Sequence, residues 1–262
     1  MKKINLLPLL ALSFSSLFIA GCDKDDDNNN NPTPVVVAPT LTIEMDHLAG
    51  SQKFYLDSTY TNANGDNFTP DLFKYYISNI RLIRNDNSEY VIPESYFLVN
   101  HEATASMKLI IDSLAPGTFK SIKFILGVDS TRNVSGAQTG ALDPVNGMFW
   151  TWNTGYIFLK LEGTSPVIPT SAQTFTYHIG GFSGQNKNYK QVTLDFDGDV
   201  LLLANNKNPE VHIVVDVLEI FKNPTTIDMA TFSNTVMSSG PNATILADNY
   251  SDMFRYSHIH NN

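Results

Sequence analysis

The stretch that decides the fold is Leu41-Thr42-Ile43-Glu44-Met45-Asp46-His47. Apolar residues take the odd positions up to Met45, and polar residues take the even positions between them. Successive side chains of a β-strand point to opposite faces, so this alternation predicts a strand with one buried face. His47 has the parity of the apolar residues and is expected on the buried face.

Similar short runs follow through most of the chain. They predict strands at 53–60, 72–84, 96–101, 106–112, 118–128, 155–162, 173–179, 190–203 and 210–221. Turn-forming pairs such as Asn64-Gly65 and Gly180-Gly181 separate these runs. The chain shows no alternation of strands with helices, no internal repeat and no heptad pattern. We therefore expect an all-β chain with a single β-sandwich domain over residues 40–262.

Two connections, 129–148 and 222–247, are longer than ordinary loops. Within or near the second, apolar residues recur with a helical period at 226–237 and 247–255. The expected sandwich therefore carries long loops and one or two short helical turns.

The composition excludes some classes of protein. The 262 residues are 42% hydrophobic, which is too apolar for a wholly disordered chain. Lysine and arginine number 17 against 26 acidic residues, a formal net charge of −9. Nucleic acid is therefore not an expected partner.

The N-terminus has the pattern of an export signal. In residues 1–21, Lys2-Lys3 precedes an apolar stretch that is too short and wrongly flanked for a membrane-spanning helix. The run Ile19-Ala20-Gly21-Cys22 resembles a bacterial lipobox, in which cleavage occurs before the cysteine and the sulfur carries lipid. Cys22 is then the membrane anchor, and as the single cysteine it leaves the domain without an internal disulfide. The alternative is an ordinary secretory signal with an incidental cysteine.

Residues 22–39 are acidic, rich in asparagine and then rich in proline, as is typical of an extended tether. Lys24-Asp25-Asp26 resembles the tags that send some outer-membrane lipoproteins to the cell surface. We expect an exported lipoprotein of a Gram-negative-type bacterium, held at the outer membrane by its lipid and facing either the periplasm or the exterior.

The common catalytic motifs are missing from the sequence. There is no G-x-S-x-G elbow, no phosphate-binding loop and no H-E-x-x-H helix. We therefore do not expect an enzyme.

The six histidines can be weighed one by one. His258 and His260 have the spacing of a strand-borne chelate, but the alternative is a frayed and solvated tail. His212 lies in an apolar strand, where a hydrogen bond to a carboxylate is the simple interpretation. His101 ends its expected strand, and His178 precedes a glycine turn.

Both tryptophans lie in the segment 147–156. Strand parity puts Trp150, Trp152 and Tyr156 on one face, with Met148 in line. Such an aromatic row is typical of core packing or of a platform on which sugars stack.

Taken together, several segments resemble the MbnP-like family of exported copper-binding proteins. The resemblance rests on a first strand that ends in His47 and on the segments Tyr75-Tyr76-Ile77-Ser78-Asn79-Ile80-Arg81-Leu82, Ser121-Ile122-Lys123-Phe124-Ile125-Leu126-Gly127-Val128-Asp129, Gly140-Ala141-Leu142-Asp143-Pro144, Gly147-Met148-Phe149-Trp150-Thr151-Trp152, Gly155-Tyr156-Ile157-Phe158-Leu159-Lys160-Leu161-Glu162-Gly163 and Tyr177-His178-Ile179-Gly180. The string around the two tryptophans is the specific part.

The resemblance implies a β-sandwich that binds one copper ion, Cu(I) or Cu(II), for acquisition or delivery. By analogy the ligands are two histidines and a tryptophan that a partner dihaem enzyme oxidises to kynurenine. The histidines fall on His47 and His178, and the tryptophan is Trp150 or Trp152. Met148 is a soft sulfur that could make an axial contact.

Three other interpretations stay open. The aromatic row could belong to a surface glycan- or protein-binding module of an uptake system, or the domain could be a redox enzyme. The loop Asp129-Ser130-Thr131-Arg132-Asn133 offers oxygen ligands for Ca²⁺, although it lacks EF-hand spacing. A plain aspartate-capped turn explains the same loop residues.

Overall fold

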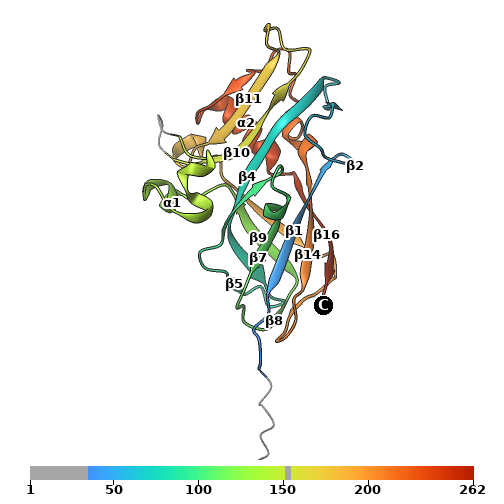
Figure 1. Cartoon of the computed structure of the whole chain (residues 1–262), viewed down its shortest axis with the longest axis vertical. Coiled ribbons are helices and arrows are strands. Elements are labelled where there is room, and N and C mark those ends of the chain that lie inside the picture. Colours follow the sequence, from blue (N-terminus) through green and yellow to red (C-terminus); the bar gives the residue numbers. More distant parts are fainter. Residues whose placement is uncertain (1–34, 151–154) are drawn as a thin grey trace, which may run out of the picture. The chain divides into compact units, whose positions relative to one another are not determined.

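The alternating stretch forms strand β1 (Leu41–Ala49), and all of its odd-numbered residues are buried. In the computed structural model, which describes residues 35–150 and 155–262, β1 pairs in parallel with β14 (Glu210–Asp216). The C-terminal strand β16 (Phe254–His260) pairs with the other edge of β14. These three strands lie side by side in Figure 1.

The other edge of β1 is shared by two short strands. β7 (Lys108–Ile111) pairs with residues 41–44, and β2 (Gln52–Lys53) pairs with residues 48 and 49. Residues 45–47 of β1 lie between these two pairings and have no strand partner on this edge among the described residues. The five strands form one sheet with a gap beside His47.

A second sheet of nine strands is organised around β4 (Asn67–Ile83). Its other members are β3 (Tyr60–Thr61), β5 (Glu89–Val91), β6 (Tyr96–Asn100), β9 (Ser121–Leu126), β10 (Ile157–Thr164), β11 (Thr174–Gly180), β12 (Lys190–Asp195) and β15 (Thr235–Val236). A separate pair is formed by β8 (Gly117–Phe119) and β13 (Leu201–Leu203). The predicted all-β fold class is confirmed, with the apolar faces of both large sheets in one core.

β4 contains a bulge between Ser78 and Arg81, within one of the segments that resemble the MbnP-like family. Asn79 adopts a left-handed backbone with φ of 54°, which asparagine tolerates better than most residues. Its side-chain amide donates to Asp129 at 2.9 Å, and the adjacent Ser78 hydroxyl donates to the Gly127 carbonyl at 2.8 Å. Two of the segments that resemble the family, 75–82 and 121–129, are therefore held together by hydrogen bonds at this bulge.

The helices are short. They are α1 (Ser130–Val134), α2 (Pro241–Tyr250) and the 3₁₀ turns Thr104–Met107, Gly140–Leu142, Pro144–Asn146, Gly184–Asn186 and Val217–Phe221. The helical turn expected at 247–255 is only partly correct, because α2 begins earlier and β16 begins at Phe254.

The helical turn predicted at 226–237 is wrong. Two buried side chains bind the backbone there: Asn62 donates to the Ile227 carbonyl at 3.1 Å, and Asp66 accepts from the Met229 amide at 2.9 Å. These tertiary hydrogen bonds satisfy polar groups that a helix would have paired internally.

Candidate metal centre

His47 lies on the core face of β1, as its parity predicts, and only 5% of it is exposed. Its ring contacts Phe73 and Tyr75 of β4, with ring centroids 5.2 and 5.6 Å apart. Nε2 of His47 lies 2.8 Å from the Tyr75 hydroxyl. The opposite sheet therefore fixes the orientation of this imidazole.

The second imidazole of this centre is His101, directly after β6. Its backbone amide donates to the Phe73 carbonyl at 3.0 Å, which sets His101 beside the strand that holds the Phe73 ring. Nδ1 of His101 lies 2.8 Å from Nδ1 of His47, and the two rings are stacked with centroids 5.0 Å apart. The Phe54 ring meets His101 edge-on.

The surroundings keep both imidazoles neutral. Burial, followed by the charge of His101, lowers the pKa of His47 to about 3. Burial and then the charge of Lys53 lower the pKa of His101. Burial raises the pKa of Tyr75 well above its usual range, so this hydroxyl keeps its proton. Neutral imidazole is the form that binds metals.

A cavity of about 380 Å³ adjoins the pair. It coincides with the gap between β7 and β2 along the edge of β1. Its lining residues are Glu44, Met45, Asp46, His47, Leu48, Lys53, His101, Met107 and Val214. Two methionines, Met45 and Met107, thus line the cavity together with the two histidines.

The lowered pKa of His47 predicts a pH-dependent stability for the metal-free chain. Between pH 6.5 and about 3 the unfolded chain binds a proton at His47 that the folded chain does not, so stability is lost as the pH falls. We expect the free energy of unfolding to drop by about 2 to 3 kcal/mol between pH 6.5 and 4.5 through this residue. Urea unfolding at both pH values measures the drop.

The matched variant for this prediction is His47→Gln, which keeps a polar side chain that does not titrate. Its stability should fall less than that of the wild type over the same pH range. Equal losses in the two proteins would show that His47 does not carry the effect.

His178 does not lie with His47. It alternates along β11 with Tyr177 and Ile179, which are both in the main core, so its ring faces the other side of the nine-stranded sheet. There Nε2 lies 2.6 Å from Oε1 of Glu162 on the neighbouring strand. Burial lowers the pKa of His178 more than the nearby carboxylate raises it. The structure thus does not form the pair of His47 with His178 that the resemblance implied.

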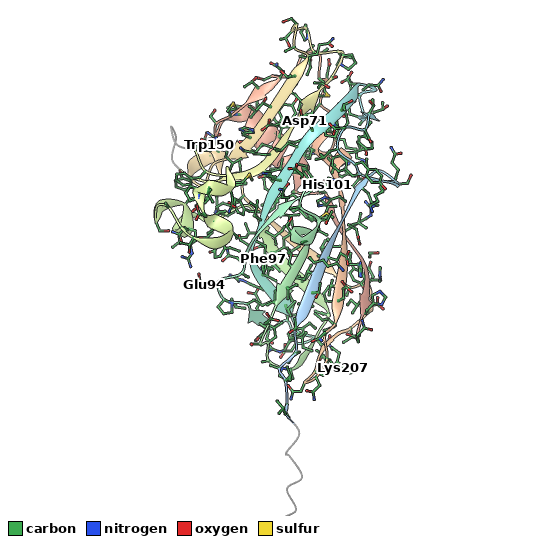
Figure 2. The ribbon with its side chains drawn as sticks, viewed as in Figure 1. Asp71, Glu94, Phe97, His101, Trp150 and Lys207 are labelled. Atoms are coloured by element: carbon green, nitrogen blue, oxygen red, sulfur yellow. The ribbon has the colours of Figure 1, made fainter. Side chains whose placement is uncertain are left out.

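Trp150 lies on the same side of that sheet as His178. It is 3% exposed and packs in a second apolar cluster with Met148 and Tyr156. The ring lies against Gly180, where a Cβ atom would come within 2.6 Å of Cη2 of the indole. Figure 2 labels Trp150 and His101, which lie well apart.

These positions bear on the interpretations of the aromatic row. The buried Trp150 and Met148 form the core packing that the sequence left as one alternative, and neither offers an exposed surface for sugar stacking. Trp152 lies outside the described residues.

The loop that begins at Asp129 forms the aspartate-capped turn. The carboxylate of Asp129 accepts hydrogen bonds from the Tyr96 hydroxyl at 2.6 Å, from Asn79 at 2.9 Å and from the Arg132 amide at 3.2 Å. Because both of its oxygens are used in the fold, the structure gives no support to the interpretation as a Ca²⁺ loop.

His101 is the site residue that the sequence pattern indicated only weakly. It shares the parity of Phe97 and Val99 and ends a strand, a pattern that left its role open. What identifies it is the cross-sheet contact with His47, which sequence spacing does not encode.

No helix within the described ranges 35–150 and 155–262 is long and apolar enough to cross a membrane. A search of curated proteins finds no significant match. MbnP from Methylosinus trichosporium is similar in structure, with a TM-score of 0.53 and 12% sequence identity over 79% of this chain and 86% of that chain. At this identity the likeness concerns the fold. The model of the family described as MbnP matches residues 38–238, most of the sequence, and the chain therefore belongs to the MbnP family.

Proposed function

We propose that this chain is an exported, lipid-anchored protein that binds copper through His47 and His101. The observation that carries the proposal is the buried contact of 2.8 Å between the two Nδ1 atoms. Two neutral imidazoles pointing at each other beside a cavity are ready to accept a metal ion at the cost of small ring movements. The family membership and the copper role implied by the sequence resemblance support the same conclusion.

The donor set fits copper. Imidazole and thioether are ligands that Cu(I) accepts, and two histidines and two methionines are among the residues that line the cavity. For Nδ1 of His47 to bind a metal, its ring proton must lie on Nε2 and be donated to the Tyr75 oxygen 2.8 Å away. A partner of this kind on the far nitrogen orients and tunes metal-binding histidines in many proteins.

The fit favours binding and delivery over catalysis. The ligands lie on β1 and directly after β6, beside a packed core, and the cavity opens at a strand edge. We propose that the protein acquires or delivers copper and is not an enzyme. The signal at residues 1–21 and Cys22 supports export and attachment to the outer membrane, and residues 22–39 would serve as the tether.

Of the two tryptophans, Trp150 is the one that the structure describes, and it takes no part in the proposed site. Trp150 lies across the nine-stranded sheet from His47, so it is not included among the ligands. If a partner dihaem enzyme acts on this chain, an intact mass would show that a tryptophan has lost a carbon and gained an oxygen.

X-ray absorption at the copper edge tests the proposed ligands. The chain loaded with one equivalent of Cu(I) should show scattering from two imidazole rings and a low coordination number. Loss of all copper from the wild type on gel filtration would contradict the proposal, as would a copper shell made only of oxygen.

A further inference from the structure

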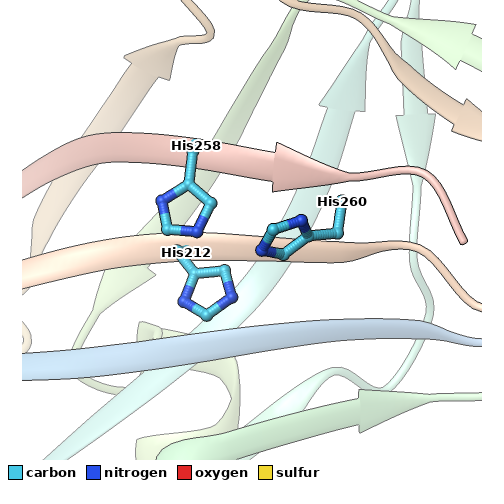
Figure 3. Close-up of side chains that lie close together, drawn as sticks. All are labelled: His212, His258 and His260. Carbon is cyan, nitrogen blue, oxygen red and sulfur yellow. The ribbon is translucent and has the colours of Figure 1, made fainter.

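A second cluster of histidines lies on the outer face of the five-stranded sheet. His212 of β14 is the register partner of His258 of β16, and His260 pairs with Glu210 two residues along the same strands. Figure 3 shows the three rings together above the adjacent strands. The C-terminal segment is therefore a paired strand, and the interpretation of it as a frayed tail is wrong.

The three rings are close enough to share one ion. One ligand atom of each histidine lies within 4.8 Å of those of the other two. The rings of His212 and His258 are stacked with centroids 4.2 Å apart, and the ring of His260 is nearly perpendicular to both, at 5.4 and 4.8 Å. Side-chain rotations on an exposed surface can bring three nitrogens to the spacing that a tetrahedral ion requires.

Two of the rings have a partner on Nδ1, which leaves Nε2 as the atom for a metal. Nδ1 of His212 lies 3.2 Å from a carboxylate oxygen of Asp46. Nδ1 of His258 lies 2.9 Å from the Ser257 hydroxyl. A histidine whose Nδ1–H is held by a carboxylate is the usual arrangement around protein-bound zinc.

Carboxylates add negative charge and a further oxygen donor. Glu44, Glu210 and His212 form a second group of potential ligands, so His212 belongs to both groups. Lys108 pairs with the two glutamates at 2.8 and 3.2 Å and offsets part of their charge. An ion bound by the three histidines therefore has an acidic surface beside it, which favours a cation.

This cluster is separate from the copper site proposed above. Glu44 and Asp46 alternate with Met45 and His47 along β1, so the cluster and His47 lie on opposite faces of the same sheet. The carboxylates Glu44 and Asp46 adjoin both places, but the imidazoles differ: His47 and His101 belong to the buried site, and His212, His258 and His260 belong to the surface cluster. Nitrogen with oxygen suits a divalent ion such as Zn²⁺ or Cu²⁺ better than Cu(I).

We infer that His212, His258 and His260 form a surface site for a divalent transition-metal ion, with Glu210, whose Oε2 lies 3.9 Å from Nε2 of His212, as a source of a fourth ligand. Because the ligands come from β14 and β16, a bound ion links the C-terminal edge strand to its neighbour. Binding should therefore also raise the unfolding temperature of the chain.

Calorimetric titration with Zn²⁺ tests the site on the purified chain without an affinity tag, after removal of metals with a chelator. The wild type should bind one Zn²⁺ with a dissociation constant in the micromolar range or below, and His258→Gln/His260→Gln should lose this binding at least about 100-fold. With Co²⁺ in place of Zn²⁺, the wild type should show the visible bands of a tetrahedral nitrogen-ligated ion, and His258→Gln/His260→Gln should not.

The control is His47→Ala/His101→Ala, which should bind Zn²⁺ at the surface site as the wild type does. That result distinguishes the surface site from the proposed copper site, because each double variant removes the ligands of only one of the two sites. Circular dichroism of each variant establishes that it is folded. Absence of Zn²⁺ binding by the wild type, or equal binding by His258→Gln/His260→Gln, would overturn the inference.

Discussion

Replacing His101 with alanine is expected to weaken Cu(I) binding by more than about 100-fold, because removal of a direct ligand should exceed the 10- to 100-fold loss that follows removal of a supporting contact. In the wild type, His101 lies at 2.8 Å from the other imidazole of the proposed site. The variant keeps His47 and both thioethers but has one imidazole. Competition with a Cu(I) chelator of known affinity measures the change.

The matched control is His178→Ala. This variant removes a histidine that is as buried as a ligand but is bonded to Glu162 on the other side of the nine-stranded sheet. Its Cu(I) affinity should equal that of the wild type. If His178→Ala lost copper and His101→Ala kept it, the pair implied by the sequence resemblance would be correct and the proposed site would not.

Gly180→Ala is expected to lower the free energy of unfolding by about 3 kcal/mol, the upper part of the usual range for an overpacked core. The added Cβ would lie 2.6 Å from the Trp150 ring and 2.6 Å from the backbone oxygen of Tyr156. The ring is enclosed in an apolar cluster, and the oxygen belongs to the residue directly before Ile157, which is the strand partner of Gly180. Neither can move away without disturbing its own packing. Chemical denaturation at neutral pH measures the loss.

Gly240→Ala is the control for this substitution. No atom lies within 4 Å of the position of its Cβ, and its backbone is extended. The expected change is about 1 kcal/mol at most, since Gly240 is the N-cap of α2, where alanine is less favourable than glycine but meets no steric conflict. If Gly180→Ala lowered the free energy of unfolding no more than Gly240→Ala does, the Trp150 ring would not be packed against Gly180.

The sequence predicted most of the fold because local alternation is itself the physical cause of strand burial. β1 is buried on the face that its apolar residues indicated, and the strands expected at 72–84, 173–179 and 210–221 overlap β4, β11 and β14. Local pattern failed where tertiary contacts decide the backbone. The segment 226–237 has a helical period, but buried side chains bind its backbone instead.

The site was predictable only in part. The parity of β1 put His47 on the buried face, and this is where it lies. The contact of His47 with His101 depends on how the two sheets face each other. The spacing of residues along the chain does not determine that arrangement. Trp150 packs against Gly180, two residues along β11 from His178, but both lie on the side of the nine-stranded sheet that faces away from His47. The histidines at the C-terminus became a cluster only through the pairing of β16 with β14.

The most direct test of the central claim is the copper content of the wild type and of His47→Ala/His101→Ala after loading with Cu(I) and dialysis against a competing chelator. We expect one copper per wild-type chain and none above background in the folded double variant. Equal copper in the two proteins would contradict it.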